Sequence, residues 1–219
     1  MNRTAAGHAA GQRRPDLAAM AVTAADIAER TGVPAITAFI MAADHQSAEQ
    51  ATAMVEGGVP VLDALATVGS FGRIGWLLDM AEQGHIDRRA VLTELPRLWP
   101  MADPDDTDPR MLLAWYGAWR HNRRRIITDG EALPPGRTFF IFRGQGRDSP
   151  LGIAWTLRMD VALKFAMGAG VRVPGGVPSP VIYQSRVHRR QIMAYLHRRG
   201  EAEVIIDPAM LYLVTVAGE

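Results

Sequence analysis

The feature that most constrains this chain is a change of pattern at residues 100–109, which read Pro-Met-Ala-Asp-Pro-Asp-Asp-Thr-Asp-Pro. Three prolines and four aspartates in ten residues disfavour regular structure, so the segment is typical of a linker or a rigid acidic loop. Before it, apolar residues recur with a helical period; after it, short β-branched and aromatic runs predominate. The sequence therefore predicts an α+β fold, with a helical region followed by a β-rich one.

The net charge changes sign at the same place. Residues 1–109 hold 8 basic and 15 acidic side chains, a net charge of −7, whereas residues 110–219 hold 16 and 8, a net charge of +8. Because charge and pattern change together, we divide the chain into a flexible tail (1–14), an acidic helical region (15–100), a Pro/Asp linker (101–109) and a basic domain (110–219). The basic domain is the part expected to hold an anionic ligand.

Composition excludes several classes of site. The chain has no cysteine, which rules out disulfides, thiolate zinc sites, iron–sulfur clusters and a cysteine nucleophile. The six histidines show no close ligand pairing, so no metal site is expected. No apolar run approaches the roughly 20 residues that span a bilayer. We therefore expect a cytoplasmic protein without a membrane partner.

Local patterns predict the elements. In the acidic region we expect a first helix that starts near Ala24, capped by Thr23 and ended by Gly32. Ser47 is expected to cap a later helix that ends at the Gly57-Gly58 pair. Further helices are expected over residues 35–44, 60–68, 74–83, 87–98, 111–127 and 160–167, and strands over 138–142, 152–157, 181–187, 192–196, 203–206 and 211–216.

An arginine and a glycine end the apolar run Phe139-Phe-Ile-Phe. A buried strand rarely ends on a charge that lacks a partner or a ligand. The guanidinium of Arg143 either grips a phosphate group or pairs with a structural carboxylate, and the residues alone leave both open. Gly144 would let a ligand approach the backbone closely.

Two further segments carry polar groups at the ends of expected strands. Thr156 falls where a strand leads into a helix, a position at which a hydroxyl often serves only as a cap. Glu201 and Glu203 have the i, i+2 spacing that places two side chains on one face of a strand. Neighbouring carboxylates repel unless a cation or polar ligand lies between them, and one of them can then have a raised pKa. A solvated pair at a strand edge is the commoner alternative.

In this order, the three segments resemble the Arg–Ser–Glu branch of the ADP-ribosyltransferase superfamily. Phe142-Arg143-Gly144 matches the first element, Ala154-Trp155-Thr156-Leu157 the second, and Glu201-Ala202-Glu203-Val204-Ile205 the third. The resemblance covers about residues 110–216 and not the helical region. It implies a split β-sheet core with flanking helices that holds NAD+ as substrate, without a metal.

The resemblance also implies roles for particular residues. Arg143, with Gly144, Trp155 and Thr156, would hold NAD+, while Glu203 would bond the ribose 2′-hydroxyl and stabilise the charge that develops as nicotinamide leaves. Glu201 would orient or deprotonate the acceptor.

The family also implies an acceptor and a biological setting. Arg198 and Arg199 would belong to the acceptor-recognition loop. A glutamate at the Glu201 position accompanies modification of arginine in the family, so a protein acceptor is favoured over nucleic acid. The setting implied is a bacterial cell or one infected by phage, with a toxin or phage effector among the candidate roles.

One position departs from the family pattern. Ala154 stands where the family has the first serine of a Ser-Thr-Ser element, which helps to fix the catalytic glutamate. The alternative function is therefore a non-catalytic NAD+-binding or assembly module that keeps the fold. A nucleic-acid binder that uses the basic half is a third reading. The oligomeric state is not predicted.

Overall fold

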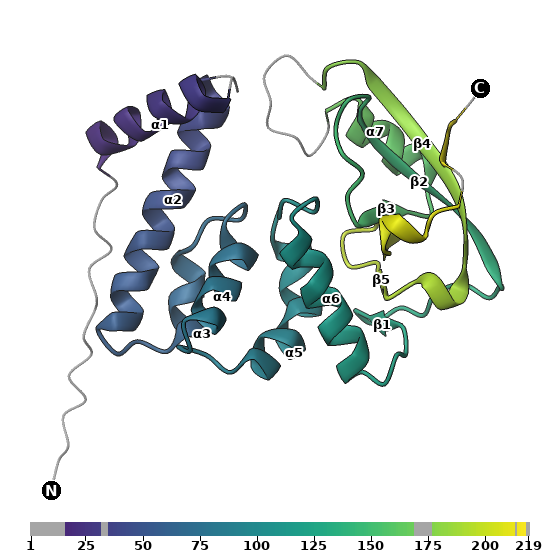
Figure 1. The fold of residues 1–219 in the computed structure, drawn as a ribbon, viewed down its shortest axis with the longest axis horizontal. Coiled ribbons are helices and arrows are strands. Elements are labelled where there is room, and N and C mark those ends of the chain that lie inside the picture. The colour runs from purple at the N-terminus through teal and green to yellow at the C-terminus, as the bar shows by residue number, and fades with distance from the viewer. Residues whose placement is uncertain (1–15, 32–34, 169–176, 213, 218–219) are drawn as a thin grey trace, which may run out of the picture.

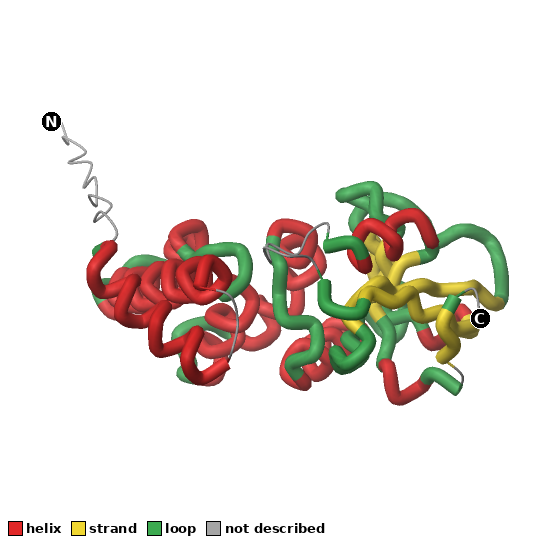
Figure 2. Tube along the Cα trace, turned by 90° about the horizontal axis from the view of Figure 1, so that it is seen from above, coloured by secondary structure: helices red, strands yellow, loops and turns green. Residues whose placement is uncertain are grey.

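The structure is a computed structural model that describes residues 16–31, 35–168, 177–212 and 214–217. The expected tail at 1–14 and the expected stop at Gly32 lie outside these residues. Helices gather at one end of an elongated molecule and a β-sheet at the other, so the fold is α+β with the helices first (Figures 1 and 2).

The helical part follows the sequence prediction except near its start and at its end, where the helix expected to reach residue 127 stops at His121 and Ile127 lies in a strand. Its elements are α1 (Leu17–Thr31), α2 (Ala35–Glu56), α3 (Val61–Ala64), η1 (Leu65–Thr67), α4 (Arg73–Glu82), α5 (Arg88–Leu98), η2 (Trp99–Met101) and α6 (Pro109–His121).

Both caps predicted in the first two helices are wrong. Thr23 lies inside α1, where its hydroxyl donates to the Ala19 carbonyl at 3.1 Å. The α1 helix begins earlier because the Asp16 carboxylate accepts from the backbone N–H groups of Ala18 and Ala19. Ser47 lies inside α2, which runs without a break across the two helices expected there.

The β-rich part forms one sheet with the strand order β1-β5-β6-β3-β2-β4-β7. All neighbouring strands pair antiparallel except β1 and β5, which are parallel. The strands are β1 (Ile127–Thr128), β2 (Thr138–Gly146), β3 (Ala154–Thr156), β4 (Pro180–His188), β5 (Ala194–Leu196), β6 (Glu203–Ile205) and β7 (Val214–Val216). The remaining elements are α7 (Met159–Ala166), η3 (Arg189–Gln191) and η4 (Pro208–Met210).

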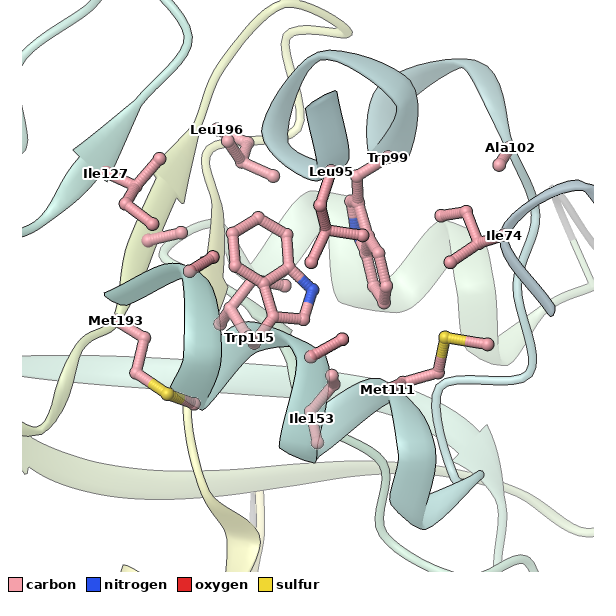
Figure 3. Packing of buried hydrophobic residues seen from close by; sticks show 14 residues of the cluster. Ile74, Leu95, Trp99, Ala102, Met111, Trp115, Ile127, Ile153, Met193 and Leu196 are labelled. Atoms are coloured by element: carbon pink, nitrogen blue, oxygen red, sulfur yellow. The ribbon is translucent and has the colours of Figure 1, made fainter. Parts of the chain in front are cut away.

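The largest core crosses the boundary that charge and pattern suggest at 101–109. Trp99 and Trp115 meet edge to face with ring centroids 5.4 Å apart (Figure 3). Around them pack buried residues from α4 and α5 and from the sheet, including Ile74, Leu95 and Ile205. The helical region and the sheet therefore share one hydrophobic core, and α6 lies between them (Figure 1).

Candidate functional site

A pocket of about 500 Å³ collects seven of the eight site residues that the sequence suggests. They are Arg143, Gly144, Trp155, Thr156, Arg199, Glu201 and Glu203. Arg198 does not line it; its backbone N–H donates to Asp129 Oδ2 at 2.7 Å, away from these residues. Segments that are far apart in the sequence thus meet in one cavity.

Arg143 is held by a carboxylate from the segment that the sequence predicts to be a linker. Asp106 accepts from Nη1 at 2.6 Å and from Nη2 at 3.0 Å, a two-pronged ion pair. Nη1 also donates to the Ala154 carbonyl at 2.6 Å, and Nε donates to Gln145 Oε1. The structural-carboxylate alternative for Arg143 is therefore the one observed.

Asp106 reaches the sheet because Gly152 leaves it room. A Cβ on Gly152 would lie 2.2 Å from Asp106 Oδ2, closer than two atoms can approach. The Ala154 N–H donates to Asp106 Oδ2 at 3.0 Å, and the Ile153 N–H donates to the Asp106 carbonyl at 3.1 Å. The segment expected to be a linker is thus attached to the start of β3. The aspartates of this segment are visible in the sequence, but nothing local indicates that Asp106 contacts β3.

Glu203 is the buried acid of the pocket, with 9% of its surface exposed. Trp99 Nε1 donates to Glu203 Oε1 at 3.0 Å, and Arg199 Nη2 lies 3.9 Å from Oε2. Burial raises the pKa of Glu203 to about 7, and the negative charges of Glu201 and Asp106 add to the rise. The Trp99 bond and the Arg199 charge oppose it. Glu203 can therefore gain or lose a proton near neutral pH.

Glu201 approaches Glu203 in a different way from the one predicted. Strand β6 begins only at Glu203, and Ala202 has a φ of +48°, so the two glutamates do not alternate along one strand. The argument from the strand period is wrong here. They converge instead on a cation, because Arg199 Nη2 also lies 2.9 Å from Glu201 Oε2.

Thr156 and Trp155 have structural contacts. The Thr156 hydroxyl donates to the Glu201 carbonyl and accepts from the Arg158 N–H at 3.0 Å, just before α7. It therefore links the end of β3 to the segment that carries Glu201. The Trp155 side chain is 2% exposed, donates to the Gly152 carbonyl and packs in a separate core cluster with Ile141.

The space beside Gly144 is used by a helix. A Cβ on Gly144 would lie 1.8 Å from the Ala162 carbonyl oxygen and 2.6 Å from the Ala166 nitrogen, both in α7. The residue must be glycine so that α7 can pack on β2. We expected the small size of Gly144 to make room for a ligand, but it makes room for α7. Gly144 still lines the pocket.

The pocket carries more acidic than basic groups. Among the described residues, Asp103, Asp106, Glu201 and Glu203 line it together with two arginines, Arg143 and Arg199. Arg199 Nη1 also lies 3.7 Å from Asp103 Oδ1, so both arginines have carboxylate partners. The positive charge of residues 110–219 is therefore not concentrated here, contrary to the expectation from the charge of the two halves.

Comparison with protein-family profiles, curated protein sequences and solved structures finds no match to this chain. Among the described residues, no helix is both long and apolar enough to cross a membrane. The same residues contain no group of three or more His, Asp or Glu side chains placed to hold a metal ion.

The arrangement has the groups that acid–base and electrostatic catalysis use. A buried carboxyl group with a pKa near 7 stands beside a second carboxylate and a guanidinium in a cavity large enough for a ligand. Such a carboxylate can oppose positive charge that develops on a bound substrate, and its neighbour can accept a proton.

Proposed function

We propose that this pocket binds NAD+ and that the chain transfers ADP-ribose to a macromolecular acceptor with release of nicotinamide. The observation that carries the proposal is the convergence of Arg143, Thr156 and Glu203 on one cavity. These residues belong to the three segments that resemble the Arg–Ser–Glu branch. The sheet register brings the segments together, because Thr156 of β3 pairs with Glu203 on one side and with Phe142, the neighbour of Arg143, on the other. The α+β fold with one β-sheet agrees with this proposal at the level of class.

In the proposed reaction, the bond between the anomeric carbon of the nicotinamide ribose and the ring nitrogen breaks. Its electron pair leaves with nicotinamide, and positive charge develops on the sugar. The carboxylate of Glu203 stabilises that charge, as carboxylates do in the cleavage of glycosidic bonds. The acceptor then forms a bond to the same carbon, and Glu201 takes its proton.

Protein arginine is the acceptor that the site favours. Glu201 and Glu203 already face one guanidinium, that of Arg199, at 2.9 and 3.9 Å. An incoming arginine side chain would find the same pair of carboxylates. It must displace Arg199 to reach them; 34% of the Arg199 side-chain surface is exposed.

Arg143 has limited capacity for a phosphate group. Four of the five N–H groups that a guanidinium carries are already used by Asp106, Ala154 and Gln145. One Nη2 hydrogen has no partner among the described residues. We propose that Arg143 contacts the nucleotide through that hydrogen while Asp106 holds the guanidinium in place.

The test is to incubate the purified chain with NAD+ labelled in the adenylate group, with and without a cell lysate. We expect nicotinamide release and label on protein, and we expect Glu203→Gln to abolish both while NAD+ binding persists. Glu131→Gln is the matched control, since Glu131 is 64% exposed and lies outside the pocket. A fully active Glu203→Gln variant, or a folded parent chain with neither activity, would refute the proposal.

One observation favours the second candidate, a module that binds NAD+ without chemistry. Ala154 offers no hydroxyl to Glu203, and Arg143 is largely occupied by Asp106. Calorimetry distinguishes the two candidates, because the module binds NAD+ and releases no nicotinamide. If Ala154→Ser then creates nicotinamide release, the non-catalytic module is the correct description of the parent chain.

A further inference from the structure

A second pocket, of about 610 Å³, lies where α6 meets the start of β2 and the end of β4. Residues of η3 and η4, together with Met193, Asp207, Leu211 and Tyr212, complete its wall. It shares no lining residue with the pocket around Glu203. The proposed ADP-ribosyl transfer gives it no role.

Three aromatic side chains line this second pocket. The rings of Tyr116 and Trp119 lie 6.4 Å apart between centroids and are tilted by 57°. The Tyr116 hydroxyl donates to Asp207 Oδ2 at 2.7 Å, which fixes the ring in position. Tyr212 is 96% exposed, so its ring is available to a ligand at the rim. Exposed rings of this kind are platforms on which planar groups stack.

Arginines without carboxylate partners surround the same pocket. Arg186 and Arg190 line it, and the Arg124 guanidinium lies 6.0 Å from the centre of the Trp119 ring. None of the three forms an ion pair within the part of the chain that the structure describes. Arg143 and Arg199 of the first pocket, in contrast, are both paired.

The single acid among the described lining residues of this pocket is already engaged. Asp207 accepts from the Tyr116 hydroxyl through Oδ2 and from the Ala209 N–H through Oδ1. Asp207 keeps its negative charge but forms no ion pair with Arg186 or Arg190, so the two lining arginines outnumber the one lining acid among the described residues. The pocket combines unpaired positive charge with aromatic rings, so an anionic ligand with planar groups fits it.

We infer that this second pocket binds single-stranded nucleic acid, with phosphates against Arg186 and Arg190 and a base against Tyr212. A duplex keeps its bases stacked internally, so only an unpaired strand offers base faces to the rings. An acidic peptide would satisfy the arginines and leave the rings unused. The inference does not depend on NAD+ or on transfer.

The test is fluorescence anisotropy of a labelled oligothymidylate of about 12 nucleotides with the full chain. We expect the double variant Arg186→Ala, Arg190→Ala to weaken binding. It should also reduce the magnitude of the slope of log affinity against log salt concentration by about 1.4, the contribution of two phosphate contacts on a single strand. Tyr212→Ala should weaken binding about fivefold or more, the effect of losing one stacked base.

Arg147→Ala is the matched control. Arg147 is exposed, forms no ion pair among the described residues, and follows the opposite end of β2 from Thr138. It should bind as the parent does, and thermal unfolding of each variant confirms that it folds. The inference is overturned if the parent does not bind saturably at low salt, or if Arg147→Ala has the same effect as the double variant. Equal affinity for a duplex of the same length, or no effect of Tyr212→Ala, would overturn it as well.

Discussion

Trp99 Nε1 donates a hydrogen bond to Glu203 Oε1 at 3.0 Å, joining residues 104 positions apart in the sequence. The donor comes from the helical region and the acceptor from the first residue of β6. Ala154 offers no hydroxyl at the position where the resembling family has a serine. We expect Trp99 to take over the positioning of Glu203.

Replacing Trp99 by phenylalanine tests this role. The variant keeps an aromatic ring in the core and removes the only N–H that holds Glu203 Oε1 among the described residues. Because that bond lowers the pKa of Glu203, its loss should raise the pKa and move the pH at which nicotinamide release is half-maximal upward. We expect lower kcat at neutral pH and a nearly unchanged KM for NAD+.

Trp115→Phe is the control for Trp99→Phe. Trp115 packs against Trp99 in the same core, and its Nε1 has no hydrogen-bond partner among the described residues. Both variants lose similar packing, but only Trp99→Phe loses a bond to Glu203. Equal pH profiles for the two would show that Trp99 acts only through packing.

Activity should rise with pH through neutrality. The proposed reaction needs the charged form of Glu203, whose pKa is raised to about 7. Below that pH the rate should fall about tenfold for each unit, and above it the rate should level off. Nicotinamide release measured from acid to alkaline pH checks this. A rate that follows the ordinary pKa of an exposed glutamate would contradict it.

Glu203→Gln should stabilise the fold at alkaline pH. The folded chain holds the Glu203 proton with a pKa of about 7, whereas the unfolded chain has the ordinary value near 4.5. The stability that this proton provides is present below the unfolded pKa and is lost as pH rises through about 7, a change of about 3 kcal/mol. Urea unfolding at pH 8 should therefore give the variant a higher free energy of unfolding than the parent chain. Near pH 5 the difference between the two should be much smaller. Equal differences at the two pH values would refute the assignment.

Asp106→Asn should destabilise the chain more than the same substitution in an exposed ion pair. Asp106 and Arg143 have only 17% and 15% of their side-chain surfaces exposed, so the variant leaves a largely buried guanidinium without its counter-charge. We expect a loss of about 2 kcal/mol in the free energy of unfolding. The control is Asp160→Asn: Asp160 accepts two bonds from Arg158, but both side chains are about half exposed. That change should alter stability much less, because an exposed ion pair contributes little, and denaturant unfolding measures both.

Gly144→Ala and Gly75→Ala should have opposite effects. The added methyl group would collide with the Ala162 carbonyl at 1.8 Å in the first case, and would meet only Arg110 Nη2 at 3.9 Å in the second. Gly144→Ala should therefore cost about 3 kcal/mol or more. Gly75→Ala lies inside α4 and should add about 1 kcal/mol, because alanine favours a helix. Thermal unfolding compares them; a tolerated Gly144→Ala would contradict the packing of α7 on β2.

Elements with local signals could be predicted. Asp87 illustrates this, because its carboxylate accepts from the Arg89 N–H at 2.6 Å and begins α5 where the sequence places it. The predicted caps at Thr23 and Ser47 fail for an equally local reason. A hydroxyl inside a helix can bond a preceding carbonyl, as Thr23 does with Ala19 and Ser47 with Asp44. The sequence pattern does not distinguish that use from a cap.

The candidate site likewise contains residues that a local pattern predicts and residues that it does not. Arg143 and Glu203 could be found because each adjoins a recognisable apolar run. The expectation that the strand ends at Arg143 is wrong, however, since β2 continues to Gly146. The partners of Arg143 and Glu203 could not be found, because Asp106 is 37 positions from Arg143 and Trp99 is still further from Glu203. Acidic residues in a proline-rich segment and a tryptophan at a helix end give no local indication of such long-range contacts.

The core that joins α4, α5 and α6 to the sheet also limits how this gene product can change. Trp99 and Asp106 precede residue 110 in the sequence, whereas Glu203 and Arg143, to which they bind, follow it. A recombination event that exchanged the helical region for another would remove both contacts and uncover Trp115 and Ile153. The two halves, opposite in charge, must therefore be inherited as one unit.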